Sequence, residues 1–236
     1  MDLGLINKKV LITGASRGIG EAIAEHFLEE GAKTFLVSRG SPQLFVTADK
    51  LKAKHNDTHV IVDTCDCTDP KSLSSLQSRI SEKWGGIDIV VANIGDGRSV
   101  SDPLPNDEQW KKTWDNNFES ALHTARTFLP MLQESKGCLL FISSITAMEA
   151  FGAPVDYSTA KTAVAALAKN MARKLAKEVR VNVLAPGNVY FEGGSWDEKI
   201  KQDPERVKSI IESTVPMNRF GTPEETAKAI AFLASP

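Results

Sequence analysis

A tyrosine and a lysine four residues apart are the side chains in this sequence best placed for proton transfer. On a helix, Tyr157 and Lys161 would project from the same face, one turn from each other. The lysine ammonium would favour the phenolate and so lower the tyrosine pKa from its usual value of ~10. Such a phenol could pass a proton to or from a substrate oxygen. Because this spacing is common, the alternative is a surface tyrosine beside a solvated lysine.

A serine hydroxyl could join this pair. Ser144 closes a strand-like apolar run, residues 139–143, and precedes Tyr157 by thirteen residues. Its hydroxyl could therefore lie at the carboxyl edge of a sheet, facing the helix that carries the tyrosine. Its neighbour Ser143 is the alternative.

A glycine-rich turn joins the first predicted strand to the first predicted helix. Its pattern is Thr13-Gly14-x-x-x-Gly18-Ile19-Gly20, in the strand-to-helix context that a dinucleotide-binding loop requires. Glycines let the backbone approach a pyrophosphate, and the helix N-terminus offers free N–H groups and a positive dipole. A plain tight turn is the alternative. The residues expected to contact the cofactor here are Gly14, Ser16, Arg17, Gly18, Ile19 and Gly20.

The end of the second predicted strand indicates which cofactor is bound. A carboxylate there would bind the adenosine ribose of NAD, but this strand ends in Ser38 and Arg39. Arg17, in the glycine-rich turn, could converge on the same place. Two guanidiniums and a hydroxyl suit a 2′-phosphate, so we predict NADP(H). Two solvated arginines are the alternative.

Apolar strands alternate with helices along the chain and would position these groups. Strands are predicted at residues 10–12, 34–37, 60–62, 87–92, 139–143 and 181–184. Helices are predicted at residues 19–31, 41–55, 70–84, 106–132, 157–177 and 222–233, with Ser41 and Thr222 as caps before proline. Strands that are apolar throughout indicate a parallel sheet covered on both faces. We expect one α/β domain, residues 1–236, with a doubly wound, Rossmann-type sheet.

The least regular stretch, residues 188–218, follows the sixth strand and contains paired glycines, a tryptophan and a charged helical piece. Open α/β sheets bind ligands beyond the carboxyl ends of their strands, so we interpret this stretch as a substrate lid. A plain surface insertion is the alternative. A partly apolar substrate pocket could be formed by Phe151, Pro154, Phe191 and Trp196. Glu149 and Asp156 lie nearby and would allow a polar substrate. The alternative is that these are core and rim residues.

Composition excludes several classes of protein. The net charge is −2 and both signs are well mixed, which argues against nucleic-acid and membrane-surface partners. Three cysteines form neither a zinc-site pattern nor a disulfide framework, so no metal is predicted. The sequence contains no run of ~18 apolar residues, the length needed to span a membrane. Its first residues do not resemble a signal peptide. We therefore expect a soluble, cytoplasmic protein.

Together, these motifs closely resemble the short-chain dehydrogenase/reductase family, and the resemblance covers essentially the whole chain. The residues that carry it are the glycine-rich turn, Asn93-Ile94-Gly95, Asn117, Ser144, Tyr157-x-x-x-Lys161, Pro186-Gly187 and the closing segment 219–225. Within the family, the chain looks most like the oxoacyl-carrier-protein reductase and sugar-alcohol dehydrogenase branch. The resemblance implies strands in the order 3-2-1-4-5-6-7, NAD(P) binding and homo-oligomers, dimers or tetramers.

The resemblance also implies roles for the catalytic residues. Tyr157 would be the general acid/base, and Lys161 would lower its pKa and hold the nicotinamide ribose. Ser144 would polarise the substrate carbonyl, since the family separates serine and tyrosine by thirteen residues. Asn117 would anchor a proton-relay water, with adjacent Asn116 as the residue that could be mistaken for it. The further cofactor contacts implied by the family are Asp66 and Cys67 near the adenine, Asn93 and Gly95 near the ribose, and Pro186, Gly187 and Val189 near the nicotinamide.

The chain departs from the family pattern in three places. Ile94 replaces the usual alanine, which would tighten the cofactor pocket. No threonine follows Pro186-Gly187 to hold the nicotinamide amide, so backbone groups or Val189 would have to do so. The sequence ends at residues 234–236, where family members usually continue into a seventh strand, so a different sheet edge is expected.

The predicted function is NADP-dependent reduction of a carbonyl, such as a 3-oxoacyl thioester or keto-sugar, or the reverse oxidation of a secondary alcohol. The main alternative is a Rossmann module that senses NADP(H) without chemistry, although a sensor has no need of a proton donor. An isomerase or dehydratase of nucleotide sugars is a third reading, against which the chain length argues.

Overall fold

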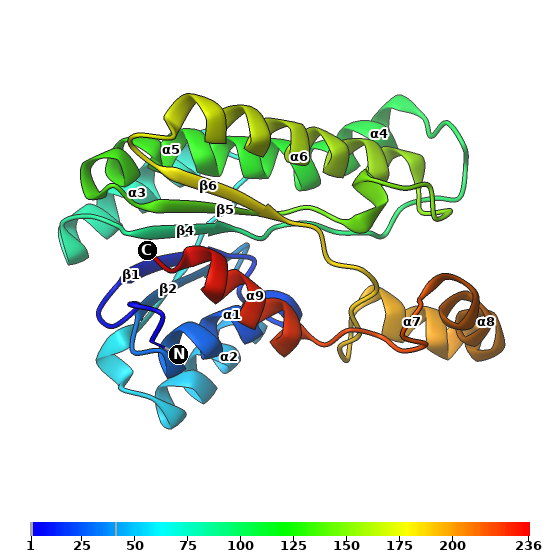
Figure 1. Ribbon diagram of the computed structural model, residues 1–236, viewed down its shortest axis with the longest axis horizontal. Helices are drawn as coiled ribbons and strands as arrows, with labels where there is room; N and C mark the ends of the chain where they lie inside the picture. Colours follow the sequence, from blue (N-terminus) through cyan, green and yellow to red (C-terminus); the bar gives the residue numbers. More distant parts are fainter. Residues whose placement is uncertain (1, 41) are drawn as a thin grey trace.

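The computed structural model describes residues 2–40 and 42–236, and a sheet of parallel strands lies at its centre (Figure 1). The strands are β1 (Lys9–Thr13), β2 (Lys33–Ser38), β3 (Val60–Thr64), β4 (Ile89–Ala92), β5 (Cys138–Ile142) and β6 (Arg180–Leu184). Their order is β3-β2-β1-β4-β5-β6, and every neighbouring pair is parallel. The predicted doubly wound sheet is confirmed for these six strands; the described residues contain no seventh.

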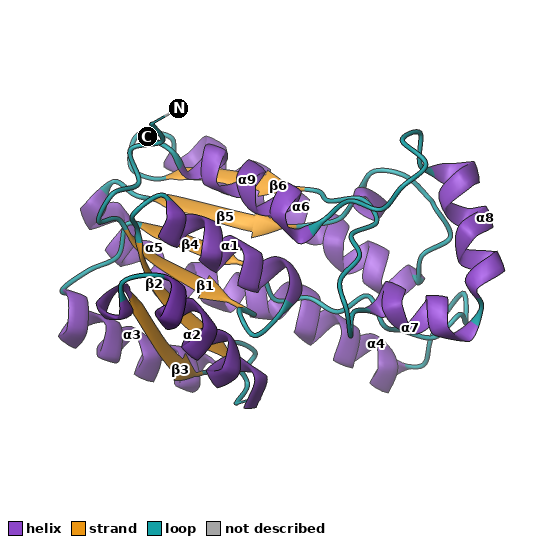
Figure 2. Cartoon of the chain, turned by 90° about the horizontal axis from the view of Figure 1, so that it is seen from below, coloured by secondary structure: helices purple, strands orange, loops and turns teal. Residues whose placement is uncertain are grey.

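Helices cover both faces of the sheet (Figures 1 and 2). One layer holds α1 (Gly18–Glu29), α2 (Pro42–Lys54) and α9 (Pro223–Ala234), and the other holds α3 (Pro70–Trp84), α5 (Ser120–Ser135) and α6 (Val155–Leu175). Successive residues of a strand point to opposite faces. In β5, Leu140 therefore packs with the first layer, while Leu139 and Phe141 pack with the second. Burial on both faces explains why the strands are apolar throughout.

The strand order reverses between β1 and β4, the position at which open α/β sheets bind ligands. The glycine-rich turn follows β1, and the loop that begins at Asn93 follows β4, so these two connections meet there. Beyond the carboxyl ends of the strands stand α7 (Ser195–Gln202) and α8 (Pro204–Thr214), the two helices of the segment predicted as a lid (Figure 1).

The predicted helix at residues 106–132 is interrupted. It consists of α4 (Asp107–Trp114), a π-helical turn η2 (Asp115–Glu119) and α5. Short 3-10 turns, η1 (Asp57–His59) and η3 (Ile145–Ala147), precede β3 and follow β5. The capping box predicted at Thr222 is present, whereas the predicted cap Ser41 lies outside the described residues. In the described parts of the chain, no helix is long and apolar enough to cross a membrane.

Candidate active site

Two glycines with positive φ, and a third glycine that lies close to the main chain of the first, shape the glycine-rich turn. Gly14 and Gly18 have φ of +65° and +58°, a conformation that favours glycine. A Cβ on Gly20 would lie 2.2 Å from the Gly14 oxygen. The amide of Asn93 donates to the oxygens of Thr13 (3.1 Å) and Gly14 (3.2 Å). The side chain of Asn93 therefore supports the turn, whereas the resemblance implied that it lies near a ribose.

The ends of α1 and β2 leave polar groups that fit a dinucleotide. No side chain caps the N-terminus of α1, so its first N–H groups are available to a phosphate. At the end of β2, the buried hydroxyl of Ser38 has no hydrogen-bond partner among the described residues. A buried hydroxyl without a partner is unfavourable unless a ligand supplies one.

The two arginines predicted to bind a 2′-phosphate have different partners in this structure. Arg17 donates to the Gly193 oxygen at 3.1 Å, and Arg39 donates to the Asn116 side-chain oxygen at 3.2 Å. Both hydrogen bonds are exposed to solvent. To bind one 2′-phosphate together, both arginines must therefore give up these solvent-exposed hydrogen bonds.

The structure brings Ser144, Tyr157 and Lys161 together. The Ser144 hydroxyl lies beside that of Tyr157, close enough to lower the pKa of the phenol. The Lys161 ammonium, one helical turn from Tyr157, lies 5.9 Å from the centre of the tyrosine ring and donates to the Ile142 oxygen at 3.1 Å. Ser144 and Lys161 are buried. A substrate oxygen reaching the two hydroxyls would find a proton donor and a hydrogen-bond donor side by side.

The expectation that the pKa of Tyr157 is lowered is wrong. Burial raises the pKa of Tyr157, and this effect outweighs that of the Ser144 hydroxyl, which lowers it; the charge of Asp96 raises it further. Burial also lowers the pKa of Lys161 to about 8. Both charged forms lose hydration in the same interior. The phenol is therefore protonated at neutral pH, which suits a proton donor.

The two adjacent serines have different partners. The Ser143 hydroxyl donates to the main-chain oxygen of Lys161 at 2.8 Å, which ties β5 to α6. The Ser144 oxygen accepts from the N–H (3.3 Å) and the hydroxyl (3.0 Å) of Thr146. Ser144 is thus the serine that lies beside Tyr157, as the spacing predicts.

Asn117 lies in the π-helical turn η2, where its buried side chain holds the loop after β4. It donates to the oxygens of Thr113 (3.0 Å) and Asp96 (3.1 Å), and it accepts from the Asp96 N–H (3.0 Å). With these bonds made, its amide has little capacity left for a relay water. A Cβ on Gly95 would lie 2.5 Å from the Lys161 nitrogen and 3.0 Å from the Asn117 oxygen. Gly95 is therefore the residue that leaves room for the ammonium.

On the adenine side, the carboxylate of Asp66 accepts from the N–H (2.9 Å) and hydroxyl (2.8 Å) of Thr68. The side chain of Cys67 is buried in the core behind α3 and α5, so only its main chain remains to face a ligand. The adenine contacts that the family implies for both residues stay predictions.

The segment after β6 folds back on the glycine-rich turn. The Pro186 oxygen accepts from the N–H of Ile145 at 3.0 Å, and Val189 forms a parallel bridge with Gly221. The ring of Phe191, predicted as a pocket residue, instead packs on Gly18: a Cβ there would lie 2.7 Å from the ring. In this structure the phenyl ring of Phe191 therefore occupies the space that the missing side chain of Gly18 leaves.

An arginine that the sequence did not single out holds the lid segment in place. Arg98, in the loop after β4, donates to both carboxylate oxygens of Glu198, each at 2.8 Å, and to the Gly193 oxygen at 3.2 Å. The partners are 100 positions apart in the chain. Only the structure could therefore reveal this contact.

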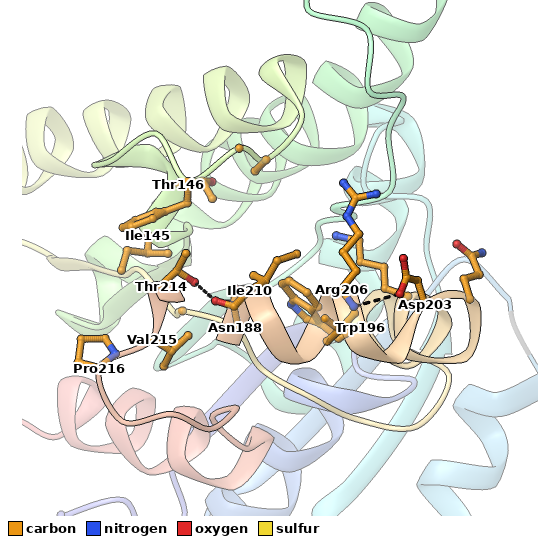
Figure 3. Close-up of a pocket in the computed structure, with 17 residues that line it drawn as sticks. Ile145, Thr146, Asn188, Trp196, Asp203, Arg206, Ile210, Thr214, Val215 and Pro216 are labelled. Carbon is orange, nitrogen blue, oxygen red and sulfur yellow. Dashed lines mark hydrogen bonds between the residues drawn. The ribbon is translucent and has the colours of Figure 1, made fainter. Parts of the chain in front are cut away.

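A cavity of about 470 Å³ lies between the lid helices and the loop after β5 (Figure 3). Its walls include Ile145, Thr146 and Phe151 from that loop, and Trp196 and Ile210 from the lid. The predicted pocket residues Phe151 and Trp196 do line it, whereas Pro154 and Phe191 do not. Among the described residues, no group of His, Cys, Asp or Glu could hold a metal ion.

Comparisons with known proteins agree with this geometry. A family model described as "Enoyl-(Acyl carrier protein) reductase" matches residues 14–236. The chain is 31% identical over 236 residues to the 3-oxoacyl-[acyl-carrier-protein] reductase FabG of Vibrio cholerae, covering 99% of this chain and 92% of that protein. It is 34% identical to the short-chain dehydrogenase/reductase SDRA of Arabidopsis thaliana, covering 98% and 89%.

Among solved structures, L-sorbose reductase from Gluconobacter frateurii, complexed with NADPH and L-sorbose, superposes with a TM-score of 0.88 at 30% identity, covering 100% of this chain and 92% of that one. The similarity thus extends over nearly the full length of both chains. The chain belongs to the short-chain dehydrogenase/reductase family and is an oxidoreductase.

Proposed function

We propose that this protein is an NADP(H)-dependent carbonyl reductase in which Tyr157 donates the proton, a reaction that runs in reverse as the oxidation of a secondary alcohol. The observation that carries the proposal is that Ser144 lies beside the Tyr157 hydroxyl, with buried Lys161 one turn away. The raised pKa of Tyr157 supports the direction of reduction, because the phenol stays protonated until a carbonyl oxygen develops negative charge.

When bound, the cofactor supplies a hydride to the carbonyl carbon. The Ser144 hydroxyl donates to the oxygen that becomes negative, and the Tyr157 phenol transfers its proton to the same oxygen. Lys161 would hold a ribose hydroxyl and stabilise the phenolate that remains. Asn117 keeps the loop after β4 in place and so positions Gly95 beside the ammonium.

The groups proposed to hold NADP(H) lie around the switch between β1 and β4. The first N–H groups of α1 would bind the pyrophosphate, and the unpartnered hydroxyl of Ser38 would meet the adenosine ribose or its 2′-phosphate. Arg17 and Arg39 would exchange their exposed contacts for the 2′-phosphate. The segment 188–218 is proposed as the lid over cofactor and substrate. A cytoplasmic location and a homodimer or homotetramer stay predictions.

The names of the relatives suggest two groups of substrates, oxoacyl thioesters and keto-sugars. An NADPH-oxidation screen across oxoacyl thioesters, diketones and keto-sugars tests the proposal. We expect turnover with at least one of these classes and a preference for NADPH over NADH. Tight NADPH binding without turnover of any carbonyl would favour the sensing role instead.

A further inference from the structure

Two cations in the wall of the cavity lack the carboxylate partners that other cations of the lid region possess. Arg98 pairs with Glu198, and Arg219 pairs with Glu225. The guanidinium of Arg206, by contrast, makes no hydrogen bond or ion pair with any of residues 2–40 and 42–236. Lys199, also in the wall, lies over the ring of Trp196, 4.4 Å from its centre.

Arg206 is exposed, and two features of its surroundings disfavour its positive charge. It lies in the first turn of α8, where the helix dipole disfavours a positive charge. Burial and the nearby charge of Arg206 lower the pKa of Lys199, so the two cations oppose each other. The one acid in the wall, Asp203, accepts from the main-chain N–H of Arg206 at 3.0 Å and caps α8. Its charge is thereby stabilised by the helix rather than by the guanidinium.

One wall residue of the cavity contacts the proposed catalytic serine. Thr146 forms part of the wall, and its hydroxyl donates to the Ser144 oxygen at 3.0 Å. In the close-up, Ile145 stands beside Thr146, and Ile210 and Trp196 are drawn between this end and Arg206, with the polar Asn188 and Thr214 nearby (Figure 3). A volume of about 470 Å³ is within the usual range of small-molecule sites.

We propose that this cavity binds the apolar body of the carbonyl substrate and that Lys199 and Arg206 bind an anionic group, a carboxylate or phosphate, at its far end. The inference rests on the proposed function, because it places the carbonyl at Ser144 and Tyr157. It predicts an amphiphilic substrate whose carbonyl and anion are separated by an apolar chain, and it disfavours neutral keto-sugars.

The test compares a medium-chain keto acid, with ketone and carboxylate at opposite ends, with its methyl ester and the matching keto-alkyl phosphate. We expect the wild-type protein to prefer both anions over the ester, and the preferred anion identifies the headgroup. Arg206→Gln and Lys199→Gln should each raise KM for the anions by about tenfold, the loss of one charged contact, and leave the ester unchanged. Lys208→Gln, an exposed cation of α8 outside the cavity wall, is the matched control.

Equal kcat/KM for anion and ester in the wild-type protein, or effects of the two variants no larger than that of Lys208→Gln, would overturn the inference. Calorimetry with octanoate and methyl octanoate repeats the comparison without turnover. Tighter binding of octanoate that depends on Arg206, in a protein that reduces no carbonyl, would refute the proposed function and uphold the anion site. Equal binding of the two would refute the anion site.

Discussion

The hydroxyl of Ser143 donates to the main-chain oxygen of Lys161 at 2.8 Å, whereas the next hydroxyl, that of Ser144, lies against Tyr157. Two adjacent serines thus have separate roles, one in the fold and one in the proposed chemistry. Ser143→Ala should lower the free energy of unfolding by about 1–2 kcal/mol, because a buried bond between strand and helix is lost. Urea unfolding measures this change.

Ser144→Ala should affect catalysis more than stability. Stability should fall by about 1 kcal/mol, because the Thr146 N–H and hydroxyl lose their acceptor, but kcat should fall by about 10²–10³-fold, the usual cost of removing an oxyanion donor. NADPH oxidation measures this loss. If Ser143→Ala abolished turnover without affecting stability, the assignment of the two serines would be reversed.

Gly95 leaves the space that the Lys161 ammonium occupies. A Cβ there would lie 2.5 Å from the lysine nitrogen, at the end of a long side chain, and 3.0 Å from the Asn117 oxygen. Gly95→Ala should therefore displace the ammonium, and kcat/KM should fall by roughly 10–100-fold. Gly86→Ala is the control, because an added Cβ there meets no atom within 4 Å. Equal activity of the two variants would contradict the proposed role of the ammonium.

The buried lysine predicts a pH-dependent stability. Burial lowers the pKa of Lys161 to about 8 in the folded protein, against ~10.4 in an unfolded chain. Between these values the unfolded state binds more protons, so the contribution of Lys161 to the free energy of unfolding rises with pH. Relative to Lys161→Met, the wild-type protein should gain roughly 3 kcal/mol across this window.

Urea unfolding of both proteins from about pH 7 to about pH 10.5 measures the difference between their free energies of unfolding. Because the two proteins share all other titrating groups, the contributions of those groups cancel in the difference. Lys169→Met, which replaces an exposed lysine on the same helix, serves as the control. A constant difference between wild type and Lys161→Met would mean that the lysine is not buried as described.

We expect Arg39 to determine the preference for NADP over NAD. Its present hydrogen bond to Asn116 is exposed and easily exchanged for a 2′-phosphate. Arg39→Asp would remove that guanidinium and place a carboxylate where it can bind a ribose 2′-hydroxyl. We expect the ratio of Kd for NAD to Kd for NADP to fall by about 100-fold. Arg126→Asp, a charge-matched change on α5, should leave the ratio unaltered; an unaltered ratio in Arg39→Asp would refute the charge argument.

Much of the fold could be predicted because its signals are local. The apolar runs of β1 and β5 and the capping box at Thr222 depend on neighbouring residues, so sequence alone identifies them. The Ser144–Tyr157–Lys161 cluster followed from spacing combined with the strand and helix that carry it. The π-helical turn η2 was not predicted, because its hydrogen bonds span only one residue more than those of an α-helix and it has no strong sequence signal.

The remaining features depend on contacts between distant segments. The Arg98–Glu198 pair and the packing of Phe191 on Gly18 join the lid segment to loops far earlier in the chain. The pKa of Tyr157 was predicted in the wrong direction because the Tyr–Lys spacing reports a charge nearby but not the burial of both groups. Burial is a property of the whole fold, and here it outweighs the effect of the neighbouring charge.

The central claim is that the Tyr157 hydroxyl supplies the proton, and replacing this tyrosine by phenylalanine tests it by removing one oxygen atom. NADPH affinity and kcat should be measured together on Tyr157→Phe, with a substrate identified in the screen. We expect an unchanged Kd for NADPH and a kcat lower by at least about 10³-fold. A kcat close to that of the wild-type protein, with NADPH bound equally well, would contradict the claim.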